Sequence, residues 1–413
     1  MASCSSGSYD NDFSQKFSPK PFLFHTQLYT VMSQKFSDGP KGGIPPWKEG
    51  EKINLKIAHW CLFGPKLSGM YETTRELIAA ENQIEGVLAG LCETPPPTAP
   101  KAVVKKAAEG GAVDAFHPEM RTQDWGWAMK WADIHVIHST MSNNVAELKP
   151  KAFFAHGTPE ACLENELMPD DKRKSFSSSA DWMNRFEASF VTSKRAEEIW
   201  KVFDPTGEKI HRISKGIDLS WWVRSSMKQD LEGSPSVLYG EIWRNIKHPF
   251  YLFYALNEIY EENKGIKLNV WGCNIKQPFW QELMKRANFD AFMGKHGIRG
   301  IVDYPEHYYS RGDVYFGSAI YGDLSRSMQE ATACGCPVIT WNSDPHGDSH
   351  AYRYAEAFSI ESLADKIMEV WEEVANNRED VALQCRKIAE KYFNVNDEAK
   401  QVVDILRKVV AEQ

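Results

Sequence analysis

Two runs of alternating strand-like and helix-like segments constrain the fold of this 413-residue chain more than any other feature. The first run extends from about residue 55 to residue 214, and the second from about residue 237 to residue 410. Strands that alternate with helices are joined by right-handed crossovers into a parallel sheet. We therefore predict an α/β protein with two doubly wound, Rossmann-like parallel sheets. Their ligands should bind at the carboxyl ends of the strands, in a cleft between the two domains.

The predicted elements follow from the apolar periodicity of each run. In the first run, strands are expected at residues 55–63, 86–91, 133–139, 151–156, 189–193 and 209–214, and helices at 70–82, 125–131 and 194–203. In the second run, strands are expected at 237–242, 267–271, 300–302, 313–317 and 337–341. Its helices are expected at 249–263, 277–287, around Glu330, and at 360–375, 378–392 and 396–410.

The two runs and the segments around them predict five parts. These are an N-terminal extension (1–52), a first Rossmann-like domain (53–215), an interdomain connection (216–235), a second Rossmann-like domain (236–395) and a C-terminal helix (396–413). The extension is rich in Ser, Pro, Gly and Lys, whereas the two domains carry the apolar periodicity.

Composition and charge exclude several classes of protein. A net charge of −8 argues against a broadly basic nucleic-acid binder. The eight cysteines show no Cys-x-x-Cys pairs, so neither a disulfide scaffold nor a zinc finger is expected, and we predict a reduced, cytoplasmic setting. The chain starts without a basic and apolar leader, and no window approaches 18 apolar residues. We therefore expect neither a signal peptide nor a transmembrane segment.

Residues 323–339 combine a loop, an amphipathic helix, a tight Gly-Cys-Pro turn and a buried strand. The start of this helix is rich in small and polar residues, and free N–H groups with a positive dipole end suit a phosphate or a sugar there. Glu330 follows about two turns into the helix, where a carboxylate can accept hydrogen bonds from two vicinal hydroxyls such as those of a ribose. Periodicity alone favours a solvated surface position for Glu330 over a functional one.

Three further motifs lie where a predicted strand meets a loop. Lys247 follows the strand at 237–242 and can neutralise a diphosphate leaving group, unless it is simply a surface charge. His156 stands at the end of an apolar strand, a position where a lone histidine is more often structural than functional. Gly69 lies between the first strand and the first helix, where a residue without Cβ allows the backbone to approach a ligand closely.

The segment from Glu330 to Ile339 has the pattern Glu-Ala-x-Ala-x-Gly-x-Pro-Val-Ile, which resembles the donor-nucleotide motif of retaining family four among the GT-B glycosyltransferases. The resemblance covers roughly residues 55–413, and it is strong in the second half and loose in the first. It implies that Glu330 holds the ribose of a nucleotide sugar. It also implies that Lys247, seven residues after Gly240, stabilises the departing diphosphate.

The chain departs from the family pattern at two positions. The family glutamate that binds the donor sugar corresponds to Gly322, so this contact would fall to Asp323 or to the backbone N–H groups of Asp323, Leu324 and Ser325. The family arginine corresponds to Glu241, and Arg244 is the expected substitute.

In the first domain the resemblance rests on fewer residues. It implies that His156 contacts the donor sugar near the anomeric carbon, and that Gly69 belongs to the loop that touches the acceptor and the diphosphate. It also implies that the first domain binds the acceptor, that the second binds the donor, and that the C-terminal helix crosses back to the first domain.

The implied activity is that of a hexosyl- or pentosyltransferase, which moves a sugar from a nucleotide-diphosphate sugar to an acceptor hydroxyl with retention. No metal and no other cofactor are implied, because basic side chains and a helix start take the place of a metal. The acceptor stays open between a glycan, a lipid, a small molecule and a hydroxymethylated DNA base, the last as in viral DNA-base glycosyltransferases. A nucleotide-sugar epimerase, a phosphorylase and a non-catalytic nucleotide-sugar binding protein remain alternatives.

Overall fold

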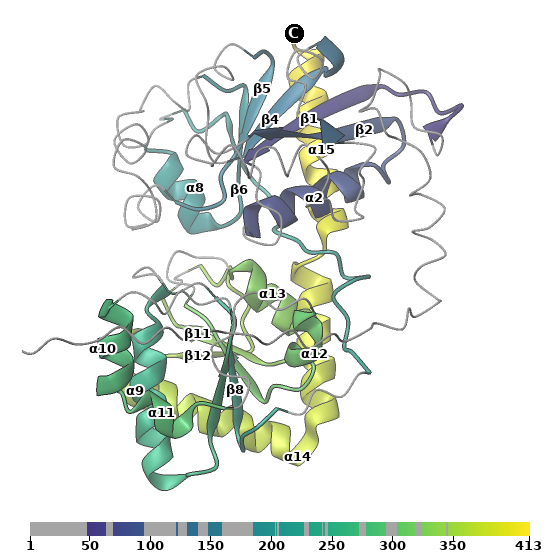
Figure 1. Ribbon diagram of the computed structural model, residues 1–413. Coiled ribbons are helices and arrows are strands. Elements are labelled where there is room, and N and C mark those ends of the chain that lie inside the picture. Colours follow the sequence, from purple (N-terminus) through teal and green to yellow (C-terminus); the bar gives the residue numbers. More distant parts are fainter. Residues whose placement is uncertain are drawn as a thin grey trace, which may run out of the picture.

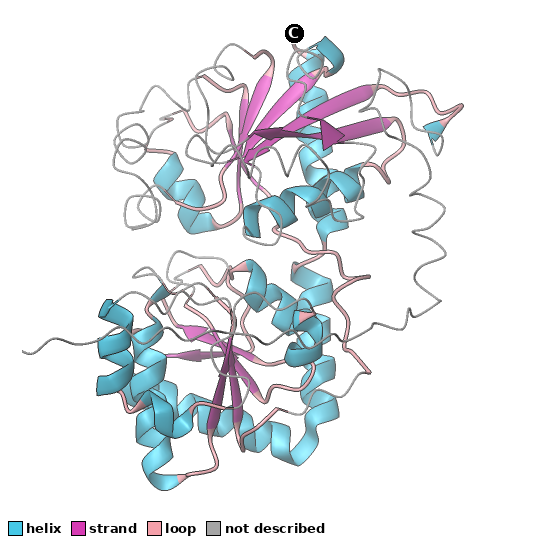
Figure 2. Cartoon of the chain, in the orientation of Figure 1, coloured by secondary structure: helices cyan, strands magenta, loops and turns pink. Residues whose placement is uncertain are grey.

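The computed structural model shows two lobes, each built around one parallel β-sheet (Figures 1 and 2). The described residues are 48–62, 69–94, 121–122, 130–138, 148–158, 185–202, 204, 206–226, 231–241, 243, 247–271, 278–294, 304–318, 324–343 and 346–413. Helices cover both sheets, as the alternation of strands and helices in the sequence predicts.

The first lobe contains a seven-stranded sheet with the order β3-β2-β1-β4-β5-β6-β7. Its strands are β1 (Leu55–Leu62), β2 (Val87–Thr94), β3 (Arg121–Thr122), β4 (Ile134–His138), β5 (Lys151–Phe154), β6 (Ala188–Val191) and β7 (Ile210–Arg212). The helices α2 (Gly69–Glu81) and α8 (Lys194–Trp200) connect β1 to β2 and β6 to β7. All described strand pairs are parallel, so the carboxyl ends of the strands share one edge of the sheet.

The second lobe contains a five-stranded sheet with the order β12-β11-β10-β8-β9. Its strands are β8 (Ser236–Tyr239), β9 (Lys267–Val270), β10 (Val314–Phe316), β11 (Val338–Trp341) and β12 (Arg353–Ala355). Its helices are α9 (Pro249–Glu262), α10 (Pro278–Arg286), α11 (Phe289–Phe292), α12 (Pro305–Tyr309), α13 (Arg326–Ala333) and α14 (Ile360–Tyr392).

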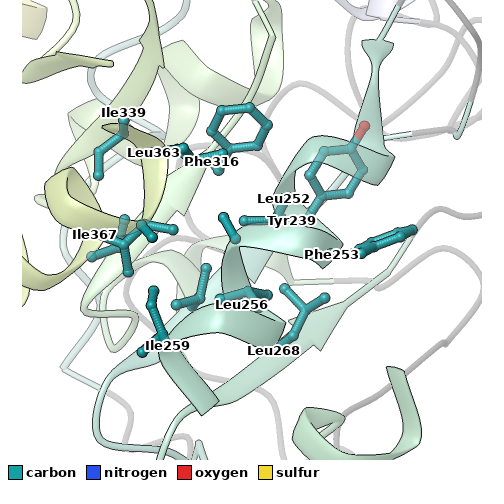
Figure 3. Packing of buried hydrophobic residues seen from close by; sticks show 14 of the residues in the cluster. Tyr239, Leu252, Phe253, Leu256, Ile259, Leu268, Phe316, Ile339, Leu363 and Ile367 are labelled. Carbon is teal, nitrogen blue, oxygen red and sulfur yellow. The ribbon is translucent and has the colours of Figure 1, made fainter. Parts of the chain in front are cut away.

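Burial explains why the strands of the second lobe are continuous apolar runs. Every residue of β8, β10 and β11 is buried, because helices cover both faces of a parallel sheet. Figure 3 shows Leu252 and Leu256 of α9 packing with Leu268 of β9, while Leu363 and Ile367 of α14 pack beside Ile339 of β11.

The structure adds elements that the sequence does not predict, namely β3, β12, α11 and α12. Each has five residues or fewer, too short to show a hydrophobic period. The two helices expected at 360–375 and 378–392 form one element, α14, with a non-helical residue at Asn377. The expected strand at 300–302 and most of the expected helix at 125–131 lie outside the described residues, as do residues 1–47.

The chain crosses between the lobes twice. After β7 it passes to the second lobe, and after α14 the last helix, α15 (Val395–Ala411), returns to pack against α2 and the first sheet. Figure 1 shows α14 in the lower lobe and α15 in the upper lobe. At the crossing, Ile217 forms a parallel bridge with Asn394, and the Gly216 N–H donates to Oε2 of Glu398 over 2.7 Å. No described helix is long and apolar enough to span a lipid bilayer.

Glu398 makes the stability of this crossing depend on pH. Burial raises the pKa of its carboxyl to about 8, helped by the nearby Glu81 and Glu76 and opposed by the Gly216 hydrogen bond and Lys215. The folded protein therefore keeps a proton that the unfolded chain releases near its ordinary pKa of 4.5. This group lowers the free energy of unfolding as the pH rises from about 4.5 to about 8.

We predict that Glu398→Gln flattens this pH dependence, because the amide oxygen still accepts from Gly216 but does not titrate. Urea denaturation at about pH 5 and about pH 9 should show a gain of up to about 5 kcal/mol at the higher pH, since one pKa unit corresponds to about 1.4 kcal/mol. Glu412→Gln, an exposed change just after the same helix, is the matched control. Parallel pH curves for the wild type and Glu398→Gln would contradict the assignment.

Candidate functional site

Helix α13 lies at the junction of the two lobes and carries the residues on which the sequence argument depends. Leu324, Met328 and Ala331 are fully buried in the second lobe and fix the helix against β10 and β11. Ser325 is the N-cap residue, with an extended backbone. The other side of α13 contacts α2 of the first lobe (Figure 1).

Glu330 points toward this junction and is almost completely buried, with 8% of its surface exposed. The Arg326 Nε donates to Glu330 Oε1 over 2.7 Å, and the Tyr309 hydroxyl donates to Oε2 over 3.3 Å. Burial raises the pKa of Glu330 to about 7; Arg326 opposes this rise and Glu76 adds to it. The Glu330 carboxyl therefore accepts hydrogen bonds from Arg326 and Tyr309, and the hydroxyls of a ligand can take the place of these donors.

Arg326 joins the two lobes, because it also donates to Glu76 on α2. Glu76 also accepts two hydrogen bonds from the interdomain connection, from the Trp222 Nε1–H over 3.2 Å and from the Asp218 N–H over 2.8 Å. Burial alone would lower the pKa of Arg326, but Glu76 and Glu330 raise it above its ordinary value. We call Glu76, Arg326 and Glu330 the interlobe triad.

Gly69, the first residue of α2, lies against the same arginine. A Cβ atom placed on Gly69 would stand 3.8 Å from Cβ of Arg326, which is ordinary van der Waals contact. The start of α2 therefore approaches the start of α13 across the junction, with both helices beginning there.

A second polar cluster surrounds the start of α13. The Lys247 Nζ donates to Oε1 of Glu241 over 3.1 Å, and the hydroxyls of Ser325 and Ser327 donate to the same oxygen. Burial alone would raise the pKa of Glu241, but Lys247 and the two hydroxyls lower it. Oε2 of Glu241 is buried without a hydrogen-bond partner among the described residues. Lys247 is thus paired with Glu241 at the place where the resemblance predicts a phosphate group.

His156 lies in the first lobe, two residues beyond the end of β5. Its ring stacks on Phe154 with a centroid distance of 4.8 Å, and its Nε2 is 2.7 Å from Nδ1 of His138. His138 in turn contacts Thr74 of α2, the helix that carries Glu76. His156 therefore lies at the carboxyl edge of the first sheet, as the sequence predicts.

The structure brings together most of the predicted site residues. Glu330, Leu324, Ser325 and Gly69 meet where α13 faces α2, and Lys247 joins them through Glu241. Arg244 and Asp323 lie outside the described residues.

Sequence reasoning missed four contributors to the site: Arg326, Glu76, Ser327 and Tyr309. Arg326 stands four residues before Glu330 on one helix, a spacing that predicts a side-chain pair. Glu76 comes from another domain, and no local pattern indicates its contact with Arg326.

Comparison with known proteins gives matches to solved structures only. No protein-family model and no curated protein sequence matches the chain. A glycosyltransferase from Rickettsia africae superposes with a TM-score of 0.62 at 14% identity, covering 88% of this chain and 100% of the other. HepE from Anabaena, solved with UDP and glucose, gives a TM-score of 0.59 at 13% identity over 86% of this chain and 100% of the other. The pneumococcal O-GlcNAc transferase GtfA, solved with UDP and GlcNAc, gives 0.59 at 13% identity over 87% of this chain and 99% of the other.

The chain has the GT-B fold. The predicted arrangement of two Rossmann-like domains is thereby confirmed over nearly the full length of these glycosyltransferases. At these identities the likeness concerns the fold, so the roles of individual residues in this GT-B protein remain proposals.

The interlobe triad leads to a stability prediction. Arg326→Met leaves two buried carboxylates without their shared cation, and removal of one partner of a buried ion pair typically costs about 3 kcal/mol or more. We expect urea denaturation at neutral pH to show a loss of this size. The matched control is Arg224→Met, which breaks the exposed pair of Arg224 with Glu379 and should change stability far less. Equal losses in the two variants would contradict the role of the triad.

Proposed function

We propose that this chain is a glycosyltransferase that moves a sugar from a nucleotide-diphosphate sugar to an acceptor hydroxyl, with retention of anomeric configuration and without a metal. The observation that carries the proposal is the position of α13. Its start presents the hydroxyls of Ser325 and Ser327, and its second turn presents Glu330, at the junction of the two lobes. Lys247, from the loop before α9, reaches the same place through Glu241. Ligands of open α/β sheets bind at the carboxyl ends of the strands, and here those edges face each other.

Glu330 is proposed to hold the ribose. Its two oxygens accept hydrogen bonds from Arg326 and Tyr309, so the carboxyl already offers the acceptor geometry that two vicinal hydroxyls need. A bound ribose would replace one or both of these donors. Its carboxyl has a pKa of about 7, and hydrogen bonds donated by the ribose would favour the ionised form.

Lys247 and the start of α13 are proposed to stabilise the departing diphosphate, together with Arg244. Lys247 pairs with Glu241, so a diphosphate has to compete with one carboxylate for this cation. Phosphate groups compete well, because they carry more charge and accept several hydrogen bonds at once from N–H and O–H donors. The Ser325 and Ser327 hydroxyls and the N–H groups at the helix start add donors that turn from Glu241 to phosphate oxygens.

His156 is proposed to contact the donor sugar near its anomeric carbon, and Asp323, Leu324 and Ser325 are proposed to contact the sugar at the start of α13. Gly69 allows the backbone of the first lobe to approach the donor and the acceptor. The basic groups and the helix start would neutralise the leaving group, which is the task that a metal has in other transferases. Closure of the lobes around the donor would exclude water and limit hydrolysis.

The nucleotide is proposed to be UDP. HepE and GtfA, two proteins of the same fold, were solved with UDP, and this makes UDP the first donor nucleotide to test. The acceptor would be a hydroxyl of a glycan, a lipid, a small molecule or a modified DNA base, bound by the first lobe.

One alternative rests on a specific observation. Glu241 replaces the arginine expected at this position and occupies Lys247, which is also the arrangement expected of a protein that binds nucleotide sugars without transferring them. Release of UDP from a UDP-sugar in the presence of acceptor candidates separates the two functions.

The proposal predicts a division of binding between two residues, which thermal-shift measurements can separate. A ligand at 100 times its Kd stabilises the folded protein by about 2.7 kcal/mol, so binding gives a clear shift. Glu330→Ala should abolish the shift caused by uridine and weaken that caused by UDP. Lys247→Ala should leave the uridine shift intact and abolish the shift caused by pyrophosphate.

Each variant is compared with its own ligand-free melting temperature, and Glu261→Ala, an exposed change on α9, is the matched control. Equal uridine shifts in the wild type and in Glu330→Ala would disprove the ribose role. The absence of any shift in the wild type with UDP, GDP, ADP and CMP would disprove the proposal as a whole.

A further inference from the structure

A chain of buried ionisable side chains runs through the first lobe from α2 to His156. Oε2 of Glu81 is 2.7 Å from Nε2 of His59, and Nδ1 of His59 is 2.9 Å from Nε2 of His138. Nδ1 of His138 is in turn 2.7 Å from Nε2 of His156. Glu81, His59 and His138 are fully buried, so water does not interrupt the chain. We call these four residues the histidine chain.

The protons of the histidine chain have to be ordered. Each nitrogen–nitrogen contact at hydrogen-bond distance needs one donor and one acceptor, and a neutral imidazole carries a single proton. Burial lowers the pKa of His138 well below its ordinary value, helped by the neighbouring His156 and His59, so the His138 ring is neutral. The chain therefore runs in one of two directions, either from His156 toward Glu81 or from Glu81 toward His156.

The Glu81 end of the histidine chain favours the direction from Glu81 toward His156, in which each group donates to the next one toward His156. Oε1 of Glu81 is buried without a hydrogen-bond partner among the described residues, so an ionised Glu81 beside a neutral His59 would be an uncompensated charge. A Glu81 carboxyl that donates from Oε2 to Nε2 of His59 avoids this cost, and Nδ1 of His59 is then the donor to Nε2 of His138.

The contact between Thr74 and His138, near the His156 end, independently favours the same direction. The Thr74 hydroxyl donates to the Met70 carbonyl over 2.9 Å, so its single proton is in use. Its oxygen is 3.1 Å from Nδ1 of His138, and two lone pairs facing each other at this distance would repel. Nδ1 of His138 must then carry the proton and donate to Thr74 and to Nε2 of His156. Thr74 is fully buried, so solvent offers no other partner at this point.

We propose that Glu81, His59, His138 and Thr74 are positioning residues that hold His156 as the tautomer with its proton on Nδ1. The contact with His138 and the stacking on Phe154 also fix the plane of the His156 ring, with a centroid distance of 4.8 Å to Phe154. His156 then presents an N–H donor rather than a lone pair. This matters because a donor recognises an electron-rich oxygen, such as a sugar hydroxyl or the departing phosphate oxygen.

The role of this donor rests on the proposed function, whereas the direction of the histidine chain does not. The first test is therefore NMR on the ligand-free, full-length protein with ¹⁵N-labelled histidine at neutral pH, with signals assigned from single His→Gln variants. Two-bond couplings from ring protons show which nitrogen carries the proton. We expect His156 and His138 to carry it on Nδ1. A proton on Nε2 of His156, or a charged His156 ring, would overturn the proposal.

Variants test how the direction is imposed. Glu81→Gln keeps a donor at the Glu81 end, and Thr74→Ser keeps the hydroxyl, so both should retain the Nδ1 tautomer. His59→Phe interrupts the chain and should give a mixture of tautomers at His156. With UDP-sugar and an acceptor, His59→Phe should lower kcat about tenfold with little change in the donor KM, a loss that corresponds to one hydrogen bond.

The matched control is Trp60→Phe. The Trp60 Nε1–H donates to His135 Nδ1 over 3.1 Å, so this change breaks a buried histidine contact between the same two strands, outside the histidine chain. In Trp60→Phe we expect the tautomer of His156 and the kcat to match those of the wild type. If Trp60→Phe and His59→Phe alter His156 equally, the effect is a general loosening of β1 and β4, and the proposal is overturned. If NMR shows the predicted tautomer of His156 but the protein transfers no sugar, the proposed function is contradicted. The proposed direction of the histidine chain is then still supported.

Discussion

The shared guanidinium of Arg326 is the interaction on which the arrangement of the site depends. It lies between Glu76 of the first lobe and Glu330 of the second, and almost no water reaches it. A planar guanidinium can serve two carboxylates at once, whereas a lysine ammonium at this place would lose the forked geometry. Because one cation neutralises two buried acids from different lobes, the distance between α2 and α13 is set by charge as well as by packing.

The same interaction bears on the proposed activity. Glu330 is occupied by Arg326 and Lys247 is occupied by Glu241, so both groups assigned to the nucleotide already have an internal partner. A nucleotide diphosphate would release both partners: its ribose takes Glu330 and its phosphates take Lys247. Release of Glu330 would leave Arg326 with Glu76 alone, which couples donor binding to the contact between lobes.

The sequence predicted the fold because local patterns encode it. The strands β1, β4, β8 and β11 are apolar runs between turn residues, and the break at Asn377 interrupts the helical period of α14. The edge strands β3 and β12 were not predicted, because two or three residues are too few to show a hydrophobic period. Within the site, the motif around Glu330 was visible, and the spacing of Arg326 to Glu330 could have indicated their pair.

Contacts between distant segments could not be predicted in this way. Glu76 and Arg326 come from different domains, and each stands on a helix whose periodicity is equally compatible with solvent exposure. The histidine chain joins residues of β1, α2 and β4 with the loop after β5. In the sequence, His59 and His138 look like ordinary members of apolar strands. Such networks follow from the order of strands in the sheet, which a single sequence does not contain.

A crystal structure of the protein with UDP is the most direct test of the central claim that α13 seats a nucleotide between the lobes. The account predicts both ribose hydroxyls within hydrogen-bond distance of the Glu330 carboxylate. It also predicts the diphosphate at Lys247 and the start of α13, with Glu241 no longer paired to that lysine. A nucleotide bound elsewhere, with the Glu330–Arg326 and Lys247–Glu241 pairs intact, would contradict it.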